Sequence, residues 1–319
     1  MSTAMWRERL QRLLAWRKSR AFRWGFGIAL LLAFAGLVLY RFAGDWRQLV
    51  RTQVAINAGF VGAAIGLCGF NFLLFLLAWQ GIVTTLGGSS GWHGNAQVYS
   101  VTYLTRFLPT SVWFFAGRIH FGDQIGLQTR HALYATGLEL GLHIGTALCF
   151  YLALEFARLT RWWAIVILVP VLIVVWRMGW LRLLKLPGDV RIRRRDMAWW
   201  GILYLVTWVT AGPYLQTVVR AFVPSTISMW DAWRIWTLAS LAGYAGFLLL
   251  GGMGFLRELS MSALLSRYLL PGDALIVAIG ARLVLLVSSI LWATLVILVT
   301  RAWSAVERKK RRTRAVDDE

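Results

Sequence analysis

Long apolar runs separated by short charged segments cover most of the chain, a pattern typical of helices that cross a membrane. Six of these runs are uninterrupted and close to the length that a membrane-spanning helix needs. They are residues 24–40, 54–79, 132–154, 162–180, 199–219 and 274–300. The pattern therefore predicts an all-α, polytopic membrane protein.

Two further apolar runs, residues 96–117 and 232–256, are interrupted by residues that break helices. The breakers are Pro109 in the first run and Gly251, Gly252 and Gly254 in the second. Each glycine would cost about 1 kcal/mol in a helix interior, and broken backbone at membrane depth persists only where protein or water satisfies its polar groups. Two interrupted segments at matching places of two halves are typical of a transporter binding site.

The distribution of basic residues decides between two topologies. The chain has 34 Lys and Arg against 14 Asp and Glu, a net charge of +20, and its basic residues cluster in residues 1–23, 181–196 and 301–319. If both interrupted runs cross the membrane, the chain has eight spans and the 181–196 cluster lies outside. If both are re-entrant hairpins, six spans remain and all three clusters lie in the cytoplasm, as the positive-inside rule requires. We therefore favour six spans, with both termini cytoplasmic.

The six-span arrangement divides the chain into three parts. Residues 1–23 form a basic amphipathic segment on the cytoplasmic surface, residues 24–300 a single transmembrane domain, and residues 301–319 a basic cytoplasmic tail. Within the transmembrane domain, residues 54–154 and 199–300 repeat the order of span, hairpin and span in opposite orientations. Such an inverted repeat is typical of transporters that alternate access around a site at the bilayer midplane.

Ionisable residues inside the predicted spans are the strongest candidates for chemistry. Glu139 lies eight residues after His131, which places it roughly 12 Å into its span. His143 follows one turn later on the same face, and Arg282 occupies the matching span of the second repeat. Charges at this depth are costly and usually functional. Two interpretations stay open: a Glu139–Arg282 pair that ties the repeats together, or a polar path for a substrate.

In the polar path, arginines would hold a phosphate, and carboxylates would balance them or bind a cationic headgroup. The glycine break would add free backbone N–H groups and a half-helix terminus that could bind an anion; close helix packing is the alternative role for these glycines. The predicted substrate-binding set is Arg118, Glu139, His143, Gly251, Gly252, Gly254, Arg257, Glu258 and Arg282. Arg118 falls in a polar connection just after the first hairpin.

Glycine spacing predicts where the spans pack against other helices. One small-xxx-small spacing lies in the run of residues 54–79, and a glycine stripe opposite Glu139 lies in the run of residues 132–154. The glycines are Gly62 and Gly66 in the first run, and Gly137, Gly141 and Gly145 in the second.

Several function classes are disfavoured. Nucleic-acid binding is not needed to explain the basic charge, because most arginines flank apolar spans. Cys68 and Cys149 lie inside apolar runs without the spacing of a disulfide framework or a metal site. The sequence contains no H-E-x-x-H or P-loop motif. We therefore predict a protein that is not an enzyme and needs no cofactor or metal.

The Leu108-Pro109 opening of the first hairpin, the run Gly251-Gly-Met-Gly-Phe-Leu-Arg-Glu258, and Arg282 beyond it resemble the lysylphosphatidylglycerol synthase transmembrane region family. The likeness covers residues 24–300, and these proteins are described as flippase-like. The first hairpin departs from the family at Thr110, Ser111 and Trp113, where small glycine-rich residues are usual. Full-length synthases continue into a cytosolic aminoacyltransferase domain. The resemblance therefore implies the lipid-translocating half without the synthase half.

These observations favour a flippase-like protein of the cell membrane (inner or plasma membrane) that translocates or binds a phospholipid or a lipid-linked glycan. The alternative is a non-transporting membrane partner of a glycosyltransferase or a lipid-synthesis enzyme. An integral-membrane transferase is less favoured, because no catalytic set of residues is visible. The sequence makes no prediction of oligomeric state.

Overall fold

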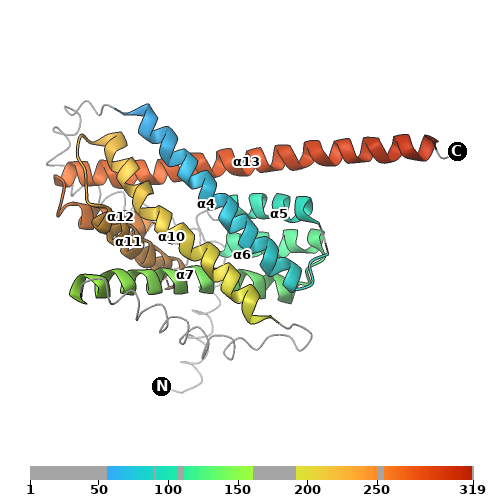
Figure 1. Cartoon of the computed structure of the whole chain (residues 1–319), viewed down its shortest axis with the longest axis horizontal. Coiled ribbons are helices and arrows are strands. Elements are labelled where there is room, and N and C mark those ends of the chain that lie inside the picture. Colours follow the sequence, from blue (N-terminus) through green and yellow to red (C-terminus); the bar gives the residue numbers. More distant parts are fainter. Residues whose placement is uncertain (1–55, 90, 106–110, 161–191, 250–254, 318–319) are drawn as a thin grey trace, which may run out of the picture. The chain divides into compact units, whose positions relative to one another are not determined.

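The computed structural model describes residues 56–89, 91–105, 111–160, 192–249 and 255–317. Regular structure in these ranges is helical throughout, which confirms the predicted all-α class for the described part of the chain (Figure 1). The helices are α4 (Ala58–Thr85), α5 (Trp92–Thr105), α6 (Ser111–Gly122), the short 3-10 helix η1 (Asp123–Ile125), α7 (Thr129–Thr160), α10 (Arg194–Phe222), α11 (Met229–Leu249), α12 (Phe255–Leu265) and α13 (Pro271–Asp317).

Four of these helices are long and apolar enough to cross a membrane, so the chain is a membrane protein. The membrane-length segments are Ala58–Thr85, Thr129–Arg158, Arg194–Phe222 and Pro271–Ser304. They coincide with four of the six uninterrupted runs found in the sequence. The other two runs, residues 24–40 and 162–180, and the predicted surface segment at residues 1–23 lie outside the described residues.

In each interrupted run, two helices that pack against each other lie on either side of the breaker residues. Helix α12 begins at Phe255, so it lies almost entirely beyond the predicted run of residues 232–256. In the first, α5 and α6 flank residues 106–110, and in the second, α11 and α12 flank residues 250–254. Glycine allows close approach within both pairs. A Cβ at Gly117 would lie 3.1 Å from the Thr105 hydroxyl oxygen, and a Cβ at Gly243 would lie 2.9 Å from the Arg257 Cβ. The breakers Pro109, Gly251, Gly252 and Gly254 lie outside the described residues.

Helices α4 and α10 run antiparallel along each other. At one end, the backbone N–H of Asn57 donates to the carbonyl of Ala221 at 2.9 Å. At the other end, Gly81 lies against the indole of Trp200, where no larger residue would fit. The N-terminal end of each helix therefore lies beside the C-terminal end of the other.

Helices α7 and α13 also run in opposite directions. Helix α7 is parallel to α10, since His143 contacts Tyr204 while Trp208, one turn later, donates to the hydroxyl of Thr146 at 3.2 Å. Helix α13 begins beside the C-terminal end of α10, where its Gly280 packs against Phe222. From there α13 follows the direction of α4 and continues past the other helices (Figure 1).

The helix contacts keep the same pattern when α4, α5, α6 and α7 are exchanged with α10, α11, α12 and α13 in that order. The α6–α7 contact becomes the α12–α13 contact, and the α5–α13 contact becomes the α11–α7 contact. Contacts of α4 with α13 correspond in the same way to contacts of α10 with α7. Only η1 has no counterpart among the described elements.

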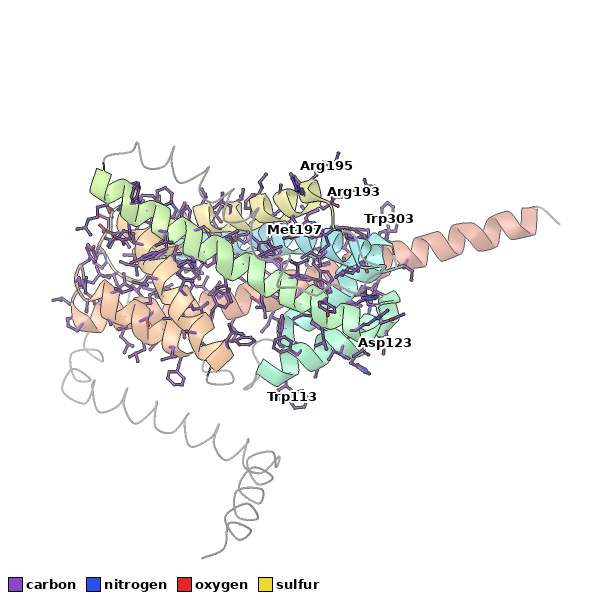
Figure 2. All side chains as sticks on the ribbon, turned by 90° about the horizontal axis from the view of Figure 1, so that it is seen from below. Trp113, Asp123, Arg193, Arg195, Met197 and Trp303 are labelled. Carbon is purple, nitrogen blue, oxygen red and sulfur yellow. The ribbon has the colours of Figure 1, made fainter. Side chains whose placement is uncertain are left out.

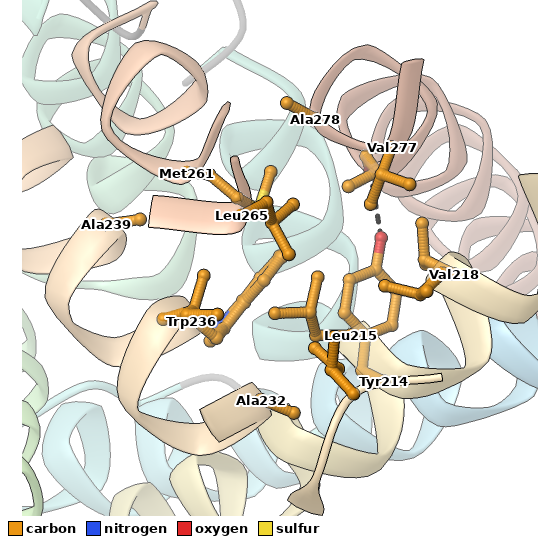
Figure 3. Close-up of a cluster of buried hydrophobic side chains, with 14 of the residues drawn as sticks. Tyr214, Leu215, Val218, Ala232, Trp236, Ala239, Met261, Leu265, Val277 and Ala278 are labelled. Atoms are coloured by element: carbon orange, nitrogen blue, oxygen red, sulfur yellow. Dashed lines mark hydrogen bonds between the residues drawn. The ribbon is translucent and has the colours of Figure 1, made fainter. Parts of the chain in front are cut away.

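Two clusters of buried apolar side chains hold these helices together. One lies among α10, α11, α12 and α13, where Trp236 and Leu215 pack with Met261 and Leu265 (Figure 3). In the same cluster the Tyr214 hydroxyl donates to the carbonyl of Ala281 on α13 at 2.9 Å. The other cluster joins α4 and α5 to α7 and α10. Lipid tails are as apolar as these side chains, so membrane helices gain little from simply leaving the lipid. Close van der Waals packing within the two clusters therefore holds the helices together.

The described helices do not pack against one another at the predicted glycines. An added Cβ at any of five glycines would have no described atom within 4 Å; these are Gly62, Gly66, Gly137, Gly141 and Gly145. Close packing occurs instead at Gly69, against the indole of Trp292, whose Nε1 donates to the carbonyl of Ile65 at 3.0 Å. Here a large side chain fills the groove that glycine leaves, so backbone-to-backbone approach is not needed.

Candidate functional site

Two adjoining cavities lie where the two sets of helices meet. The larger, which we call the charged cavity, has a volume of about 200 Å³. Its ionisable lining residues are Glu139, His143, Arg257 and Arg282. Aromatic side chains form most of the remaining wall, from Phe75, Tyr99, Tyr103, Phe114, Tyr204, Tyr244 and Phe247.

The smaller cavity, about 90 Å³, lies at mid-height of the membrane-length helices, and we call it the central cavity. The residues at or next to the midpoints of the four membrane-length segments all line it: Asn71, His143, Trp208 and Ser288. The two cavities share the side chain of Arg257. A site near the bilayer midplane between two helix repeats is where transporters bind their substrates.

Arg118 of α6 forms a buried ion pair with Glu139 of α7. Its Nη2 donates to the two carboxylate oxygens at 2.9 and 3.2 Å, and only 1% of its side chain is exposed. Its guanidinium carbon lies 3.7 Å from the ring centre of Trp79, 4.8 Å from Tyr99 and 5.4 Å from Phe114. Cation–π contacts with these rings offset part of the cost of removing the charge from water.

Glu258 of α12 forms the second buried carboxylate and lies between two arginines. Arg257 Nη2 contacts its Oε1 at 2.7 Å, and Arg282 Nη1 of α13 contacts its Oε2 at 3.0 Å. The Glu258 side chain is 6% exposed, whereas Arg257 and Arg282 are 22% and 45% exposed. Both arginines also line the charged cavity. This wall therefore has one more positive than negative charge, and its positive groups face the open space.

The structure gives the two intramembrane ions different partners from the single pair considered in the sequence. Glu139 pairs with Arg118, and Arg282 pairs with Glu258, although Glu139 and Arg282 both line the charged cavity. The predicted position of Arg118 in a polar connection is also wrong, because it lies within α6 and is buried.

The predicted set is thus partly assembled around one space. Glu139, His143, Arg257 and Arg282 line the charged cavity, while Arg118 and Glu258 contact them from behind. His143 lies among aromatic rings, stacked on Trp208 at 4.7 Å and edge-on to Phe75 at 5.0 Å. The three glycines of the predicted set, Gly251, Gly252 and Gly254, lie outside the described residues.

Sequence reasoning missed the hydroxyl-bearing residues at the site. The Tyr204 side chain is buried beside the charged cavity, and its hydroxyl has no hydrogen-bond partner in the structure. The central cavity is lined by several hydroxyls, among them Thr207, Ser240, Ser288 and Ser289. Adjacent serines in the middle of an apolar run, Ser288-Ser289, were the available signal.

The arrangement can bind an anion in a cavity among the membrane-length helices. Arg118, Arg257 and Arg282 carry three positive charges, and Glu139 and Glu258 carry two negative ones, so these five groups have a net charge of +1. Guanidinium groups suit phosphate because they donate two parallel hydrogen bonds. The Tyr204 hydroxyl could donate a further one.

No protein-family model matches the chain, and no curated protein is significantly similar to it in sequence. The resemblance of the hairpin motifs to the lysylphosphatidylglycerol synthase transmembrane region family stays a prediction.

Proposed function

We propose that this protein is a flippase-like membrane protein that binds an anionic lipid headgroup in the charged cavity and translocates it between leaflets. The lipid would be a phospholipid or a lipid-linked glycan of the cell membrane. The observation that carries the proposal is the position of Arg257 and Arg282, which line a cavity among membrane-length helices and share the carboxylate of Glu258. An excess of positive charge at such depth is costly unless a ligand shares it.

We further propose that the chain is an inverted repeat whose two helix pairs are re-entrant hairpins. Two observations support this arrangement. Helices α4 and α10 are antiparallel, and each contact between helices has a counterpart when α4 to α7 are exchanged with α10 to α13. Exposed arginines at the N-terminal end of α10, including Arg193 and Arg195, support a cytoplasmic position for that end (Figure 2). Six spans with both termini in the cytoplasm follow from this orientation and the sequence pattern.

In the proposed mechanism, the headgroup passes between the two hairpins while its acyl chains stay in the bilayer. Arg257 and Arg282 donate hydrogen bonds to the phosphate in place of the water molecules that it loses on entering the cavity. Charge-assisted hydrogen bonds of this kind are short and strong. The aromatic wall of the charged cavity faces the glycerol backbone and the first part of the chains. Movement of one repeat against the other would then open the site to each leaflet in turn.

The proposal is tested by reconstituting the purified chain in liposomes and following leaflet exchange of fluorescent anionic lipids. Arg257→Ala and Arg282→Ala are each expected to slow exchange about tenfold to a hundredfold, the factor for a lost hydrogen bond to a charged group. Arg234→Ala is the matched control, because Arg234 pairs with Glu155 away from both cavities. Exchange no faster than in protein-free vesicles, for every anionic lipid tried, would contradict translocation and favour the partner-protein alternative.

A further inference from the structure

His143 lies where the charged cavity and the central cavity meet. The chain has four histidines, and of these only His143 belongs to the described lining of either cavity; it belongs to both. It is also next to the midpoint of the membrane-length segment Thr129–Arg158. Ionisable side chains at such depth are costly, and histidines and carboxylates found there form proton relays in pumps and transporters.

We infer that His143 binds a proton together with the anionic headgroup, so that translocation is a proton–lipid symport driven by a pH gradient. The inference rests on the proposed function and adds its energy source. A phosphodiester headgroup carries one negative charge, so a single proton makes the transported pair neutral. A neutral pair crosses the low-dielectric part of the protein at a lower cost than an unbalanced charge does.

The surroundings of His143 suit both of its protonation states. Its ring stacks on Trp208 at 4.7 Å and makes edge-to-face contacts with Tyr204 and Tyr244, each at 5.4 Å, as a neutral aromatic ring does. When the ring is protonated, the indole of Trp208 provides a cation–π contact. Glu139, one turn earlier on the same face of α7, places a carboxylate in the lining of the charged cavity. The ring can therefore gain and lose a proton without repacking.

The arginines of the charged cavity couple the proton to the anion. Arg257 and Arg282 line this cavity together with His143, and Arg257 also lines the central cavity with it. In the empty site, the two guanidinium charges oppose a further positive charge on His143. A bound phosphate neutralises them, so the site takes up a proton as it takes up the anion. Because binding linkage is reciprocal, protonation of His143 must strengthen anion binding by the same factor.

His143 is the side chain of the site that changes its charge near neutral pH. The other titratable residues lining the two cavities are Cys68 of α4, Tyr99 and Tyr103 of α5, Glu139 of α7, Tyr204 and Tyr214 of α10, Tyr244 of α11, Arg257 of α12 and Arg282 of α13. The ordinary pKa of histidine is close to neutral, whereas those of cysteine, tyrosine and arginine are higher and that of glutamate is lower. A change in lipid affinity between about pH 6 and about pH 8 is therefore assigned to His143.

Binding of phosphatidylmethanol to the full chain in detergent tests the coupling. Its phosphodiester keeps one negative charge throughout this pH range, so titration of the lipid plays no part. The wild-type protein is expected to bind it about tenfold more tightly at the lower pH, the factor for a unit charge roughly 10 Å away at an effective dielectric constant of about 20. His143→Gln cannot take up a proton and is expected to bind with the same affinity at both pH values.

His120→Gln is the matched control, because His120 is exposed on α6 and lines neither cavity. This variant is expected to keep the wild-type ratio of affinities. Equal wild-type affinity at the two pH values, or a ratio that survives in His143→Gln, would overturn the inference while leaving anionic-lipid binding intact. If phosphatidylmethanol binds no better than phosphatidylcholine at either pH, the proposed function fails and the inference with it.

A pH gradient across reconstituted vesicles tests the coupling of the proton to lipid movement. Fluorescent phosphatidylmethanol starts equally distributed between the leaflets, and equal potassium concentrations with valinomycin hold the membrane potential at zero. With a gradient of about one pH unit, the lipid is expected to accumulate on the more alkaline side towards about a tenfold ratio, the limit for one proton per lipid. Nigericin, which collapses the gradient, is expected to abolish the accumulation, and vesicles without protein give the baseline.

The vesicle assay separates the inference from the proposed function. Equal leaflets under the gradient, with exchange still faster than in protein-free vesicles, would show an uncoupled translocator and overturn the inference alone. Accumulation that persists in His143→Gln would confirm coupling but overturn the assignment of the proton to His143. Exchange at the protein-free rate would contradict translocation and the symport together.

Discussion

The two equivalent helix pairs, α6–α7 and α12–α13, are each joined by an arginine and a glutamate, with the charges exchanged. In the first pair, the shorter helix carries Arg118 and the long helix carries Glu139. In the second, the shorter helix carries Glu258 and the long helix carries Arg282. The same packing geometry therefore presents a carboxylate to the charged cavity on one side and guanidinium groups on the other.

The two ion pairs consist of the same chemical groups, but their arginines differ in how deeply they are buried. Arg118 is almost fully buried, with its guanidinium bonded to Glu139 and close to three aromatic rings. Arg282 keeps 45% of its side chain exposed and shares Glu258 with Arg257. The first pair is therefore built to fix a helix contact, and the second to offer positive charge to a ligand.

The largest effect that separates the two pairs is expected from Glu139→Gln. Loss of the carboxylate charge leaves Arg118 buried without a counter-ion, which costs about 3–5 kcal/mol of unfolding free energy for pairs of this kind. Thermal unfolding in detergent measures it. Glu155→Gln is the control, because the Glu155–Arg234 pair is partly exposed and is expected to cost no more than about 1 kcal/mol.

A double variant tests whether the first pair is structural. Replacing both ions with apolar residues, Arg118→Met with Glu139→Leu, is expected to restore most of the stability, since buried pairs rarely beat well-packed apolar side chains. A double variant as unstable as Glu139→Gln would mean that the charges do more than fix the contact between α6 and α7.

The next comparison is between the two helix pairs on either side of the breaker residues, α5–α6 and α11–α12. In Gly243→Ala the new Cβ would lie 2.9 Å from the Cβ of Arg257, an atom that cannot move without its helix, so α12 must shift. We expect a loss of about 1–3 kcal/mol in stability, as for other overpacked sites, together with weaker lipid binding through displaced Arg257. In Gly117→Ala the neighbour is the Thr105 side chain at 3.1 Å, which can give way more easily. Equal losses of stability in Gly243→Ala and Gly117→Ala, measured by the same unfolding assay, would contradict the expected difference between the two helix pairs.

The sequence predicted the parts of the fold that depend on local composition. The four membrane-length helices coincide with apolar runs because hydropathy is a property of consecutive residues. The breaks predicted at Pro109 and at Gly251–Gly254 lie outside the described residues and stay predictions. Helix α13 continues to Asp317, however, through residues that the sequence assigned to a cytoplasmic tail, because Lys and Arg are good helix formers even without apolar neighbours.

The pairing of the ions could not be predicted, because it depends on contacts between residues far apart in the chain. Arg118 follows an apolar run and reads as a loop residue, yet Trp79 of α4 and Tyr99 of α5 cover it. The sequence singled out Glu139 and Arg282 as ions in membrane-length runs but could not show that each has a partner within its own helix pair. Which serines of an apolar run face a cavity is likewise decided by packing alone.

A smaller effect on stability is expected from Arg282→Ala. Its side chain is nearly half exposed and Glu258 keeps Arg257 as a partner, so the loss should be about 1 kcal/mol or less. Slower leaflet exchange with nearly unchanged thermal unfolding would therefore place Arg282 in ligand binding. A loss of several kcal/mol would instead make the second pair as structural as the first.

The smallest change in stability is expected from Tyr204→Phe, which alters one atom between the two walls of the charged cavity. The Tyr204 hydroxyl is buried and has no hydrogen-bond partner among the described residues, so its removal should change the unfolding free energy by no more than about 0.5 kcal/mol. In the wild-type protein a bound phosphate would accept a hydrogen bond from this hydroxyl, so affinity for anionic lipid should fall about threefold to tenfold in the variant. Tyr214→Phe is the contrasting control, because the Tyr214 hydroxyl donates to Ala281 and its loss should lower stability rather than binding. Unchanged affinity in Tyr204→Phe would show that the headgroup lies nearer to Arg282 than to Tyr204, and would restrict the binding wall to the second helix pair.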